Sequence, residues 1–486
     1  MIPVLLIAVP LLGGILSFLI KDEKSVRVWS LGSSLITLVI MILGLRASHD
    51  NLYAHYEWMA GFGSSFSVGI DGLGKILCLL TAVSFPVIFT ATWRHQYTKT
   101  SSFYALMLLS QAGLMGVFVS FDALLFYFFW ELALIPAYFL CSIWGGEKRI
   151  AVTFKFFIYT FIGSLFMLIG LLYIYTKTPD QSFALESFYK VVLSNKEQLW
   201  LFWILFIAFA VKMPIFPFHT WQPDTYEQSP TAVTMVLSGV MVKMGVFGLL
   251  RWLVPVVPAG SWIWGDTVST LAIIGMIYAS LIAMRQDDLK RLVAYSSIAH
   301  MGLMCVAIFA TQQTGMQGVM IQLFNHGINI IGLWIVVELI ERQFGTRKMS
   351  ELGGLAQKAP ALAILLVIVA LANVALPLTN GFVGEFLMFT GVFNSNVTKY
   401  NIVFAATSGV TIILSAVYTL NMLQKVLFGE TGSSTANAKD IRINEKLVLV
   451  VLVILILAVG VYPKPMLEIT QTTADSILSR MLNKHP

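Results

Sequence analysis

The sequence predicts an all-α integral membrane protein, and three observations lead to this fold class. The chain of 486 residues is 57% hydrophobic and 12% charged, with a mean hydropathy of +0.81, so it has too little polar surface to cover a water-soluble protein of its size. Apolar runs of about 20 residues, the length that crosses a bilayer as a helix, recur along almost the whole chain. The polar loops between them are too short to hold a separate domain.

These runs predict about fourteen membrane-spanning helices. In chain order they cover residues 2–20, 27–45, 72–93, 103–121, 122–143, 151–175, 199–218, 228–253, 268–284, 291–310, 316–340, 361–393, 402–428 and 446–462. The following segment, PMLEITQTTADSILSRML at 465–482, is amphipathic and is predicted to lie at the membrane interface or against a neighbouring helix.

The basic residues of the short loops predict the orientation of the chain. Loops on one side carry about 18 of the 31 Lys and Arg residues, against about 10 on the other. These basic loops are 21–27, 94–99, 147–149, 285–291, 341–348 and 425–446. Because basic loops stay in the cytoplasm, we expect a multi-pass protein of the bacterial inner membrane with this side cytoplasmic. An even number of helices then places both termini in the periplasm.

Two of the predicted spans are expected to be discontinuous helices. The span 199–218 contains Pro214 and Pro217, and the span 361–393, about 33 residues long, contains Pro377. Proline removes a backbone hydrogen bond and clashes with the preceding turn of a helix. The backbone groups that are freed cannot face lipid, so both breaks are predicted to line a polar or protein-enclosed cavity.

The two breaks lie at corresponding places in the chain. Glu131 precedes Lys212 by 81 residues, and His300 precedes Glu385 by 85. Interrupted helices at matching positions of two halves are typical of transporters built from inverted repeats. We therefore predict one polytopic domain made of three N-terminal helices (1–100), two inverted five-helix repeats (103–253 and 268–428), each with a discontinuous helix, and a last helix with an amphipathic tail (446–486).

Five ionisable side chains lie inside predicted spans: Glu131, Lys155, Lys212, Lys243 and Glu385. A charged side chain facing lipid at the centre of a helix costs ~2.5–3.5 kcal/mol, so these groups are predicted to face the protein interior and to pair. Intramembrane ionisable residues commonly mark ion pathways. Alternatively, these residues form static ion pairs that only stabilise the fold. Lys155 lies near a helix end, so its side chain could instead extend to the membrane surface and place its charge there.

A buried lysine is suited to proton transfer for a chemical reason. Burial favours the neutral amine, whereas a nearby carboxylate favours the charged ammonium. Moving or protonating that carboxylate therefore switches the lysine between holding and releasing a proton. Glu131 and Lys212 would form such a switch if they face each other.

Three histidines extend this set, namely His219, His300 and His326. Each titrates near neutrality and could relay protons, or could simply satisfy a neighbouring backbone group. No pair of histidines has the placement expected for haem ligation. Cys78, Cys141 and Cys305 are far apart without CxxC spacing, and no GxGxxG or Walker-type loop is present, so we expect neither a metal nor a nucleotide site.

The stretches around these residues resemble the antiporter-like proton-translocating subunits of respiratory complex I (NADH:quinone oxidoreductase). They are FFWELALIPAYFL, FAVKMPIFPFHTWQPDTYEQSPT, VMVKMGVFGLLRW, LKRLVAYSSIAHMGL, LFNHGI and LPLTNGFVGEF. Together they span most of the chain in the family's order. Two features resemble the M-type branch of this family, the counterpart of mitochondrial chain 4. Sister branches usually have lysine where this chain has Glu385, and the chain has no room for a long C-terminal lateral helix.

The resemblance implies a role for each ionisable residue. Glu131 and Lys212 would be the ion pair of a first half-channel, Lys243 a central relay, and Glu385 the acid of a second half-channel. The histidines that would belong to a central hydrated axis are His219, His300 and His326. Asp71 and Asp122 also match family positions, and Asp122 and Lys155 are secondary candidates for the path.

The resemblance also implies the partners. NADH, FMN, iron–sulfur clusters and quinone would be bound by other subunits, so this chain would carry no cofactor or metal. L-type and N-type neighbours would connect it to the hydrophilic NADH-oxidising arm, and it would contact lipid but no nucleic acid. Three alternatives stay open: a subunit of a multisubunit Na⁺/H⁺ antiporter, a subunit of a membrane-bound hydrogenase or ferredoxin-dependent complex, and a non-transporting scaffold.

Overall fold

The computed structural model describes residues 1–432, 434–435 and 439–482. They form two compact units, which are considered separately. Unit 1 comprises Met1–Met213, Gln228–Gly265 and the chain from Ile469 onward, and unit 2 comprises Pro214–Glu227 and Asp266–Glu468.

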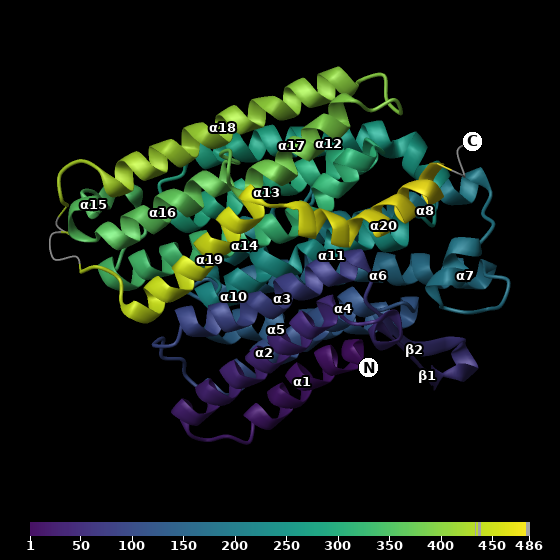
Figure 1. The fold of residues 1–486 in the computed structure, drawn as a ribbon, viewed down its shortest axis with the longest axis horizontal. Coiled ribbons are helices and arrows are strands. Elements are labelled where there is room, and N and C mark those ends of the chain that lie inside the picture. Colours follow the sequence, from purple (N-terminus) through teal and green to yellow (C-terminus); the bar gives the residue numbers. More distant parts are fainter. Residues whose placement is uncertain (433, 436–438, 483–486) are drawn as a thin grey trace. The chain divides into compact units, whose positions relative to one another are not determined.

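Unit 1 consists of apolar helices and one β-hairpin (Figure 1). The helix α1 packs against α2 and α4, and α6 packs against α8. The elements are α1 (Ile2–Ser17), α2 (Glu23–Leu45), β1 (Tyr53–Met59), β2 (Ser64–Gly69), α3 (Gly72–Ala91), α4 (Thr100–Val119), α5 (Ala123–Trp144), α6 (Arg149–Lys177), α7 (Leu185–Lys190), α8 (Asn195–Lys212), α10 (Thr231–Val236), α11 (Lys243–Gly248) and most of α20 (Lys464–Leu482).

Unit 2 is helical throughout the part that the structure describes, and α14 packs against α13, α16 and α17. The elements are α9 (Trp221–Gln228), most of α12 (Pro258–Arg285), α13 (Leu289–Phe309), α14 (Gln313–Phe344), α15 (Leu355–Lys358), α16 (Pro360–Asn373), α17 (Asn380–Phe393), α18 (Asn401–Leu427) and α19 (Ile443–Val461).

The helical membrane fold class is confirmed. Within the described residues, eleven helices are long and apolar enough to cross a membrane, and two shorter apolar helices, α1 and α16, accompany them. The predicted count of fourteen and the inverted repeats stay predictions.

Both predicted helix breaks are present. The helix α8 ends at Lys212, and the next helix, α9, begins only at Trp221, so Pro214 and Pro217 lie in the interruption. The second long span divides into α16 and α17, with Pro377 between them. Ala375 and Leu378 have positive φ angles of 57° and 73°, a conformation that costs free energy for residues with a Cβ atom.

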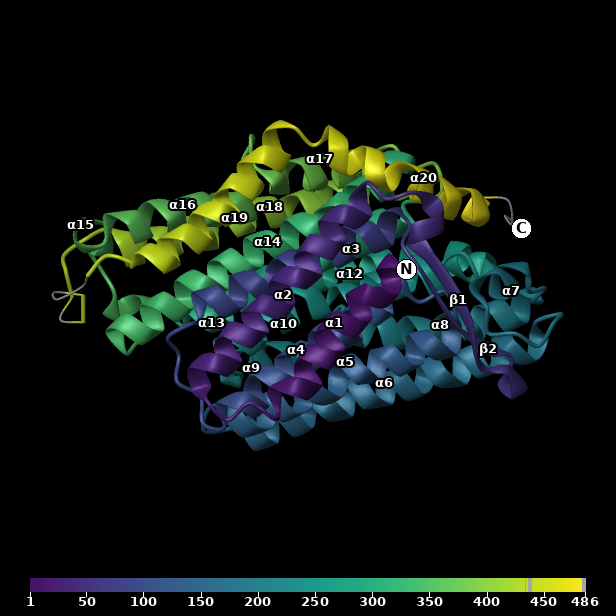
Figure 2. The ribbon, with the colours of Figure 1, turned by 60° about the horizontal axis from the view of Figure 1, so that its bottom comes forward.

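The sequence prediction missed the antiparallel hairpin β1–β2 (Figure 2), in which Tyr53 pairs with Gly69. Gly63 turns the chain with φ of 70°, which glycine adopts without strain. The signal was present in the sequence. Two runs rich in aromatic and β-branched residues or serine flank the turn sequence AGFG, but the search for long apolar runs passed over them.

The span predicted as one regular helix at 228–253 contains two π-helical turns, Leu237–Met241 and Leu249–Leu253. A π-helical turn shifts the hydrogen bonds from i−4 to i−5 and is frequent at functional sites. Apolar periodicity does not report this shift, because every residue from Thr231 to Leu253 is buried.

Candidate functional site

Lys212 is the last residue of α8 and is 1% exposed. Its Nζ lies 5.6 Å from the centroid of the Trp130 ring and 5.9 Å from that of Phe156, so aromatic faces surround the cation. Nζ makes no hydrogen bond to the residues that the structure describes. Glu131 follows Trp130 directly on α5, and its Oε1 is likewise buried without such a partner.

The ion pair implied for Glu131 and Lys212 is not a direct contact in this structure. No salt bridge joins Glu131 to Lys212 in the described structure, although the two opposite charges attract each other over a longer distance. The aromatic contacts through Trp130 place the two charges in one neighbourhood. A rearrangement or a bridging water is therefore required for a proton to pass between them.

Lys243, the first residue of α11, is completely buried. Its Nζ donates a hydrogen bond of 2.7 Å to the carbonyl of Ser238, which lies in the preceding π-helical turn. Close packing fixes this helix against α8, since a Cβ added at Gly245 would lie 2.7 Å from the carbonyl oxygen of Phe209. The end of α8 and the start of α11 are thus packed closely together.

The secondary candidates Lys155 and Asp122 have different surroundings. Lys155 is half-buried on α6, next to Phe156, whose ring faces Lys212. Asp122 is completely buried and caps α5, because Oδ1 accepts hydrogen bonds from the backbone N–H groups of Leu124 and Leu125. It also accepts one from the Ser64 hydroxyl at 2.8 Å, which ties the hairpin to α5. This geometry serves the fold whether or not Asp122 carries protons.

Asp71 caps α3 and pairs with Arg251. Its Oδ1 accepts hydrogen bonds from Arg251 Nη2 at 2.7 Å and from the backbone N–H of Gly74 at 2.9 Å. Burial by itself raises the pKa of the Asp71 carboxyl, but Arg251 and the backbone N–H of Gly74 outweigh it and hold that pKa below its usual range. The sequence analysis did not pair these two residues.

In unit 2, His219 lies in the interruption between α8 and α9 and is 4% exposed. Its ring stacks on Phe216, with centroids 5.7 Å apart, and meets Tyr278 edge to face at 5.4 Å. The imidazole is thus held between aromatic rings.

His300 and Glu385 form the best-defined pair of predicted residues. His300 Nδ1 lies 3.0 Å from Glu385 Oε1, and both side chains are 8% exposed. The His326 ring lies 5.4 Å from that of His300, centroid to centroid, and His326 Nε2 lies 3.3 Å from the Ser297 hydroxyl. The tertiary fold therefore brings three predicted groups from α13, α14 and α17 into one cluster.

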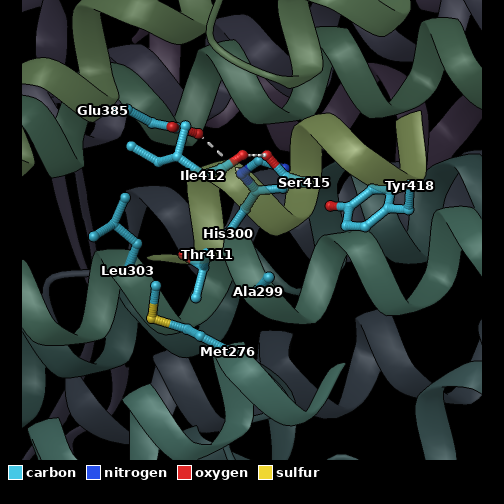
Figure 3. Close-up of a pocket in the computed structure, with 9 residues that line it drawn as sticks. All are labelled: Met276, Ala299, His300, Leu303, Glu385, Thr411, Ile412, Ser415 and Tyr418. Carbon is cyan, nitrogen blue, oxygen red and sulfur yellow. Dashed lines mark hydrogen bonds and ion pairs between the residues drawn. The ribbon is translucent and has the colours of Figure 1, made fainter. Parts of the chain in front are cut away.

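A small cavity adjoins this cluster (Figure 3). Its volume is about 20 Å³, and His300, Glu385, Thr411, Ser415 and Tyr418 supply its polar lining. The last three come from α18, which the sequence analysis did not connect with the site. Their hydroxyl groups lie on one face of α18, at spacings of four and three residues, which was the only sequence signal for them.

Two amides stabilise the second helix break and were also missed. Asn325 Nδ2 donates a hydrogen bond of 2.7 Å to the carbonyl of Asn380, and Asn329 Nδ2 donates one of 3.2 Å to that of Ala372. Both lie on α14, one turn apart on either side of His326. Asn329 thus reaches a carbonyl group in the last turn of α16, and Asn325 ties α14 to the first residue of α17. Two amides at i and i+4 in an apolar span could have indicated this role.

The segment after the first break is held within unit 2 by charges. Glu227, in α9, accepts hydrogen bonds from Arg291 Nη1 at 2.8 Å and from Arg347 Nη2 at 2.9 Å. Arg291 also lies 3.4 Å from Asp224, and Arg347 pairs with Asp288 at the start of α13. A helix of eight residues is marginal on its own, so this network stabilises the position of α9.

The arrangement provides several buried titratable groups with oxygen, nitrogen or aromatic neighbours, and without a metal-binding cluster among the described residues. Carboxylate, imidazole and amine groups at these depths can exchange protons over hydrogen bonds of about 3 Å or through single waters.

Known proteins are similar to this chain in sequence and in fold. A family model described as "NADH:quinone oxidoreductase/Mrp antiporter, TM" matches residues 120–415. NADH-quinone oxidoreductase subunit M of Rickettsia typhi is 36% identical, and the match covers 91% of this chain and 89% of that protein. F(420)H(2) dehydrogenase subunit M of Methanosarcina mazei is 32% identical, with 99% of each covered.

A solved structure agrees with these sequence matches. A chain of respiratory complex I from Thermus thermophilus with bound NADH superposes with a TM-score of 0.89 at 28% identity, covering 98% of this chain and 100% of that one. The chain belongs to the family of antiporter-like, proton-translocating membrane subunits shared by NADH:quinone oxidoreductases and Mrp antiporters.

Proposed function

We propose that this chain is the M-type proton-translocating subunit of an NADH:quinone oxidoreductase, and that its buried Glu, Lys and His residues carry protons across the membrane. The observation that carries the proposal is the buried pair of His300 and Glu385, 3.0 Å apart beside a cavity. Both side chains are buried inside the protein, and the pair places an acid beside a base, so that a proton can pass from one to the other.

The proposed pathway has two halves. In unit 1, Glu131 and Lys212 exchange charge at the first helix break, and Lys243 is the central relay. In unit 2, Glu385 releases the proton after the second break, with His219, His300 and His326 as relays. Changing the state of Glu131 alters whether Lys212 holds its proton, which drives the transfer onward.

The chain itself contributes no redox centre in this proposal. Electrons pass from NADH to quinone through FMN and iron–sulfur clusters in partner subunits, and L-type and N-type subunits are the membrane neighbours. The complex lies in a bacterial inner membrane with both termini of this chain in the periplasm. The relatives named as NADH-quinone oxidoreductase subunit M support this assignment.

The test compares wild type with Lys212→Ala and Glu131→Gln in the assembled, reconstituted complex. Proton uptake is expected to fall by about 10²-fold in Lys212→Ala and by a smaller factor in Glu131→Gln, because each loses a titratable group of the first half-channel. Quinone reduction is measured in parallel, with assembly checked by native gel. Lys348→Ala, which removes an exposed lysine, is the matched control.

Normal coupled proton uptake in a fully assembled Lys212→Ala complex would contradict the mechanism. Copurification of NADH-oxidising subunits with the chain decides the electron donor. The second candidate is an F420H2-oxidising complex, because the match to the Methanosarcina mazei subunit covers 99% of both chains. Sodium-dependent uptake would instead favour an Mrp-type antiporter.

A further inference from the structure

The cavity beside Glu385 has the size and lining of a site for one water molecule. Its volume of about 20 Å³ exceeds the roughly 10–15 Å³ that a single buried water needs. A buried water is stable where two to four polar groups meet it, and this cavity presents a carboxylate, an imidazole and three hydroxyl groups.

Tyr418 lines this cavity, and the proposed pathway gives it no role. It is 1% exposed, and its hydroxyl makes no direct hydrogen bond to the residues that the structure describes. It lines the same cavity as the Glu385 carboxyl group. Phenylalanine would fill the same space without a polar atom. The buried hydroxyl is therefore unfavourable unless the cavity gives it a partner.

The remaining hydroxyl groups are oriented to serve such a water. Thr411 Oγ1 donates to the carbonyl of Ser408 at 2.6 Å, and Ser415 Oγ donates to that of Ile412 at 2.8 Å. Since their protons are engaged, their lone pairs are left to accept hydrogen bonds. Figure 3 shows these groups and the Tyr418 hydroxyl on α18, around the same space as His300 and Glu385.

We propose that Tyr418 is a positioning residue of the proton path, whose hydroxyl holds one water molecule in this cavity against the carboxyl group of Glu385. This inference rests on the proposed function, because it assumes that Glu385 carries a proton. It adds α18 to the cluster of Glu385, His300 and His326.

The proton balance needs no other reactant. When Glu385 is protonated, its O–H donates to the water, and the water donates to the Tyr418 oxygen. When Glu385 is ionised, the hydrogen bonds reverse, so the Tyr418 hydroxyl donates to the water and the water donates to the carboxylate. Tyr418 and the water keep their own protons, and the proton that Glu385 releases passes to His300 Nδ1, 3.0 Å away.

The experiment is infrared difference spectroscopy on the assembled complex, combined with proton uptake. The carboxyl C=O band of Glu385 is assigned by its loss in Glu385→Gln. Tyr418→Phe removes one oxygen and keeps the ring, so it should shift that band and lower proton uptake. Tyr400→Phe, the same change at the exposed residue that precedes α18, should do neither.

Each outcome decides the proposal. An unchanged Glu385 band together with unchanged proton uptake in assembled Tyr418→Phe would overturn it, and so would a shift of equal size in Tyr400→Phe. Normal proton uptake in Glu385→Gln would instead overturn the proposed function of Glu385, and Tyr418→Phe would then have no path to affect. Ser415→Ala, which removes a water ligand but leaves the phenol, should shift the band less than Tyr418→Phe.

Discussion

At the scale of single residues, the free-energy cost of burying charged side chains is offset in different ways in this chain. Lys243 donates to a carbonyl of its own helix, Lys212 lies among aromatic rings, and Arg251 pairs with Asp71. Of these, the pair of Asp71 and Arg251 is a direct ion pair between a carboxylate and a guanidinium that is 5% exposed. Removing one partner of such a pair leaves an uncompensated charge.

Asp71→Asn is expected to lower the free energy of unfolding by about 3 kcal/mol at neutral pH, because Arg251 keeps its charge and loses its carboxylate. The pKa of Asp71 is lower in the folded chain than in the unfolded chain. Its contribution is therefore fully present above about pH 5 and is lost as the pH falls through the folded pKa.

Thermal unfolding of the purified complex, followed from about pH 3 to pH 7, measures this contribution. The difference between wild type and Asp71→Asn should narrow toward acid pH. Asp50→Asn, at an exposed position, is the control and should leave the curve unchanged. A constant difference at every pH would show that the ion pair does not account for the loss.

At the scale of elements, two close approaches of backbone decide where the interrupted helices lie. Gly245 of α11 faces the end of α8, where an added Cβ would be 2.7 Å from the Phe209 carbonyl and 2.8 Å from the Met213 amide nitrogen. Gly381, at the start of α17, faces the end of α16, with the Ala372 carbonyl 2.2 Å from an added Cβ. In both cases the obstacle is backbone, which cannot rotate away.

Gly245→Ala is expected to destabilise unit 1 by about 1–3 kcal/mol and to reduce proton uptake, since α11 must move away from α8 and carry Lys243 with it. Gly409→Ala on α18 is the matched control, because nothing lies within 4 Å of an added Cβ there. That change should be neutral or slightly stabilising, as alanine favours helix over glycine. Equal unfolding temperatures for the two variants would refute the close-packing argument.

At the scale of the whole molecule, the distribution of basic loops sets the orientation in the membrane. The insertion of short loops follows their Lys and Arg content. The three cysteines are buried, so a polar thiol reagent should label only cysteines introduced at exposed positions.

His49→Cys is expected to react with a membrane-impermeant maleimide in intact cells, because its loop lies on the side predicted to be periplasmic. Lys348→Cys should react only after the membrane is permeabilised, because it belongs to a basic loop. Both native side chains are exposed, so the two variants differ only in the side of the membrane from which the maleimide can reach the cysteine. Labelling of Lys348→Cys alone in intact cells would reverse the orientation.

The fold class and the breaks follow from the sequence because they depend on local quantities. Apolar length sets the spans, and the prolines remove hydrogen bonds where they stand, so the ends of α8 and α16 fell close to the prolines that predict them. The hairpin β1–β2 was missed because a search for long apolar runs does not register short alternating strands. The π-helical turns were missed because they leave composition unchanged.

The ionisable residues were named by the sequence, but their partners were not. His300 meets Glu385 across 85 residues and Asp71 meets Arg251 across 180, whereas Glu131 and Lys212 make no direct salt bridge. Which side chains meet depends on how each helix is rotated and packed. The sequence by itself determined a helical membrane protein with two broken helices and buried charges, because hydrophobicity and proline act locally. Only the tertiary structure decided that α18 adds Thr411, Ser415 and Tyr418 to the Glu385 cavity, because that contact exists only once distant helices pack together.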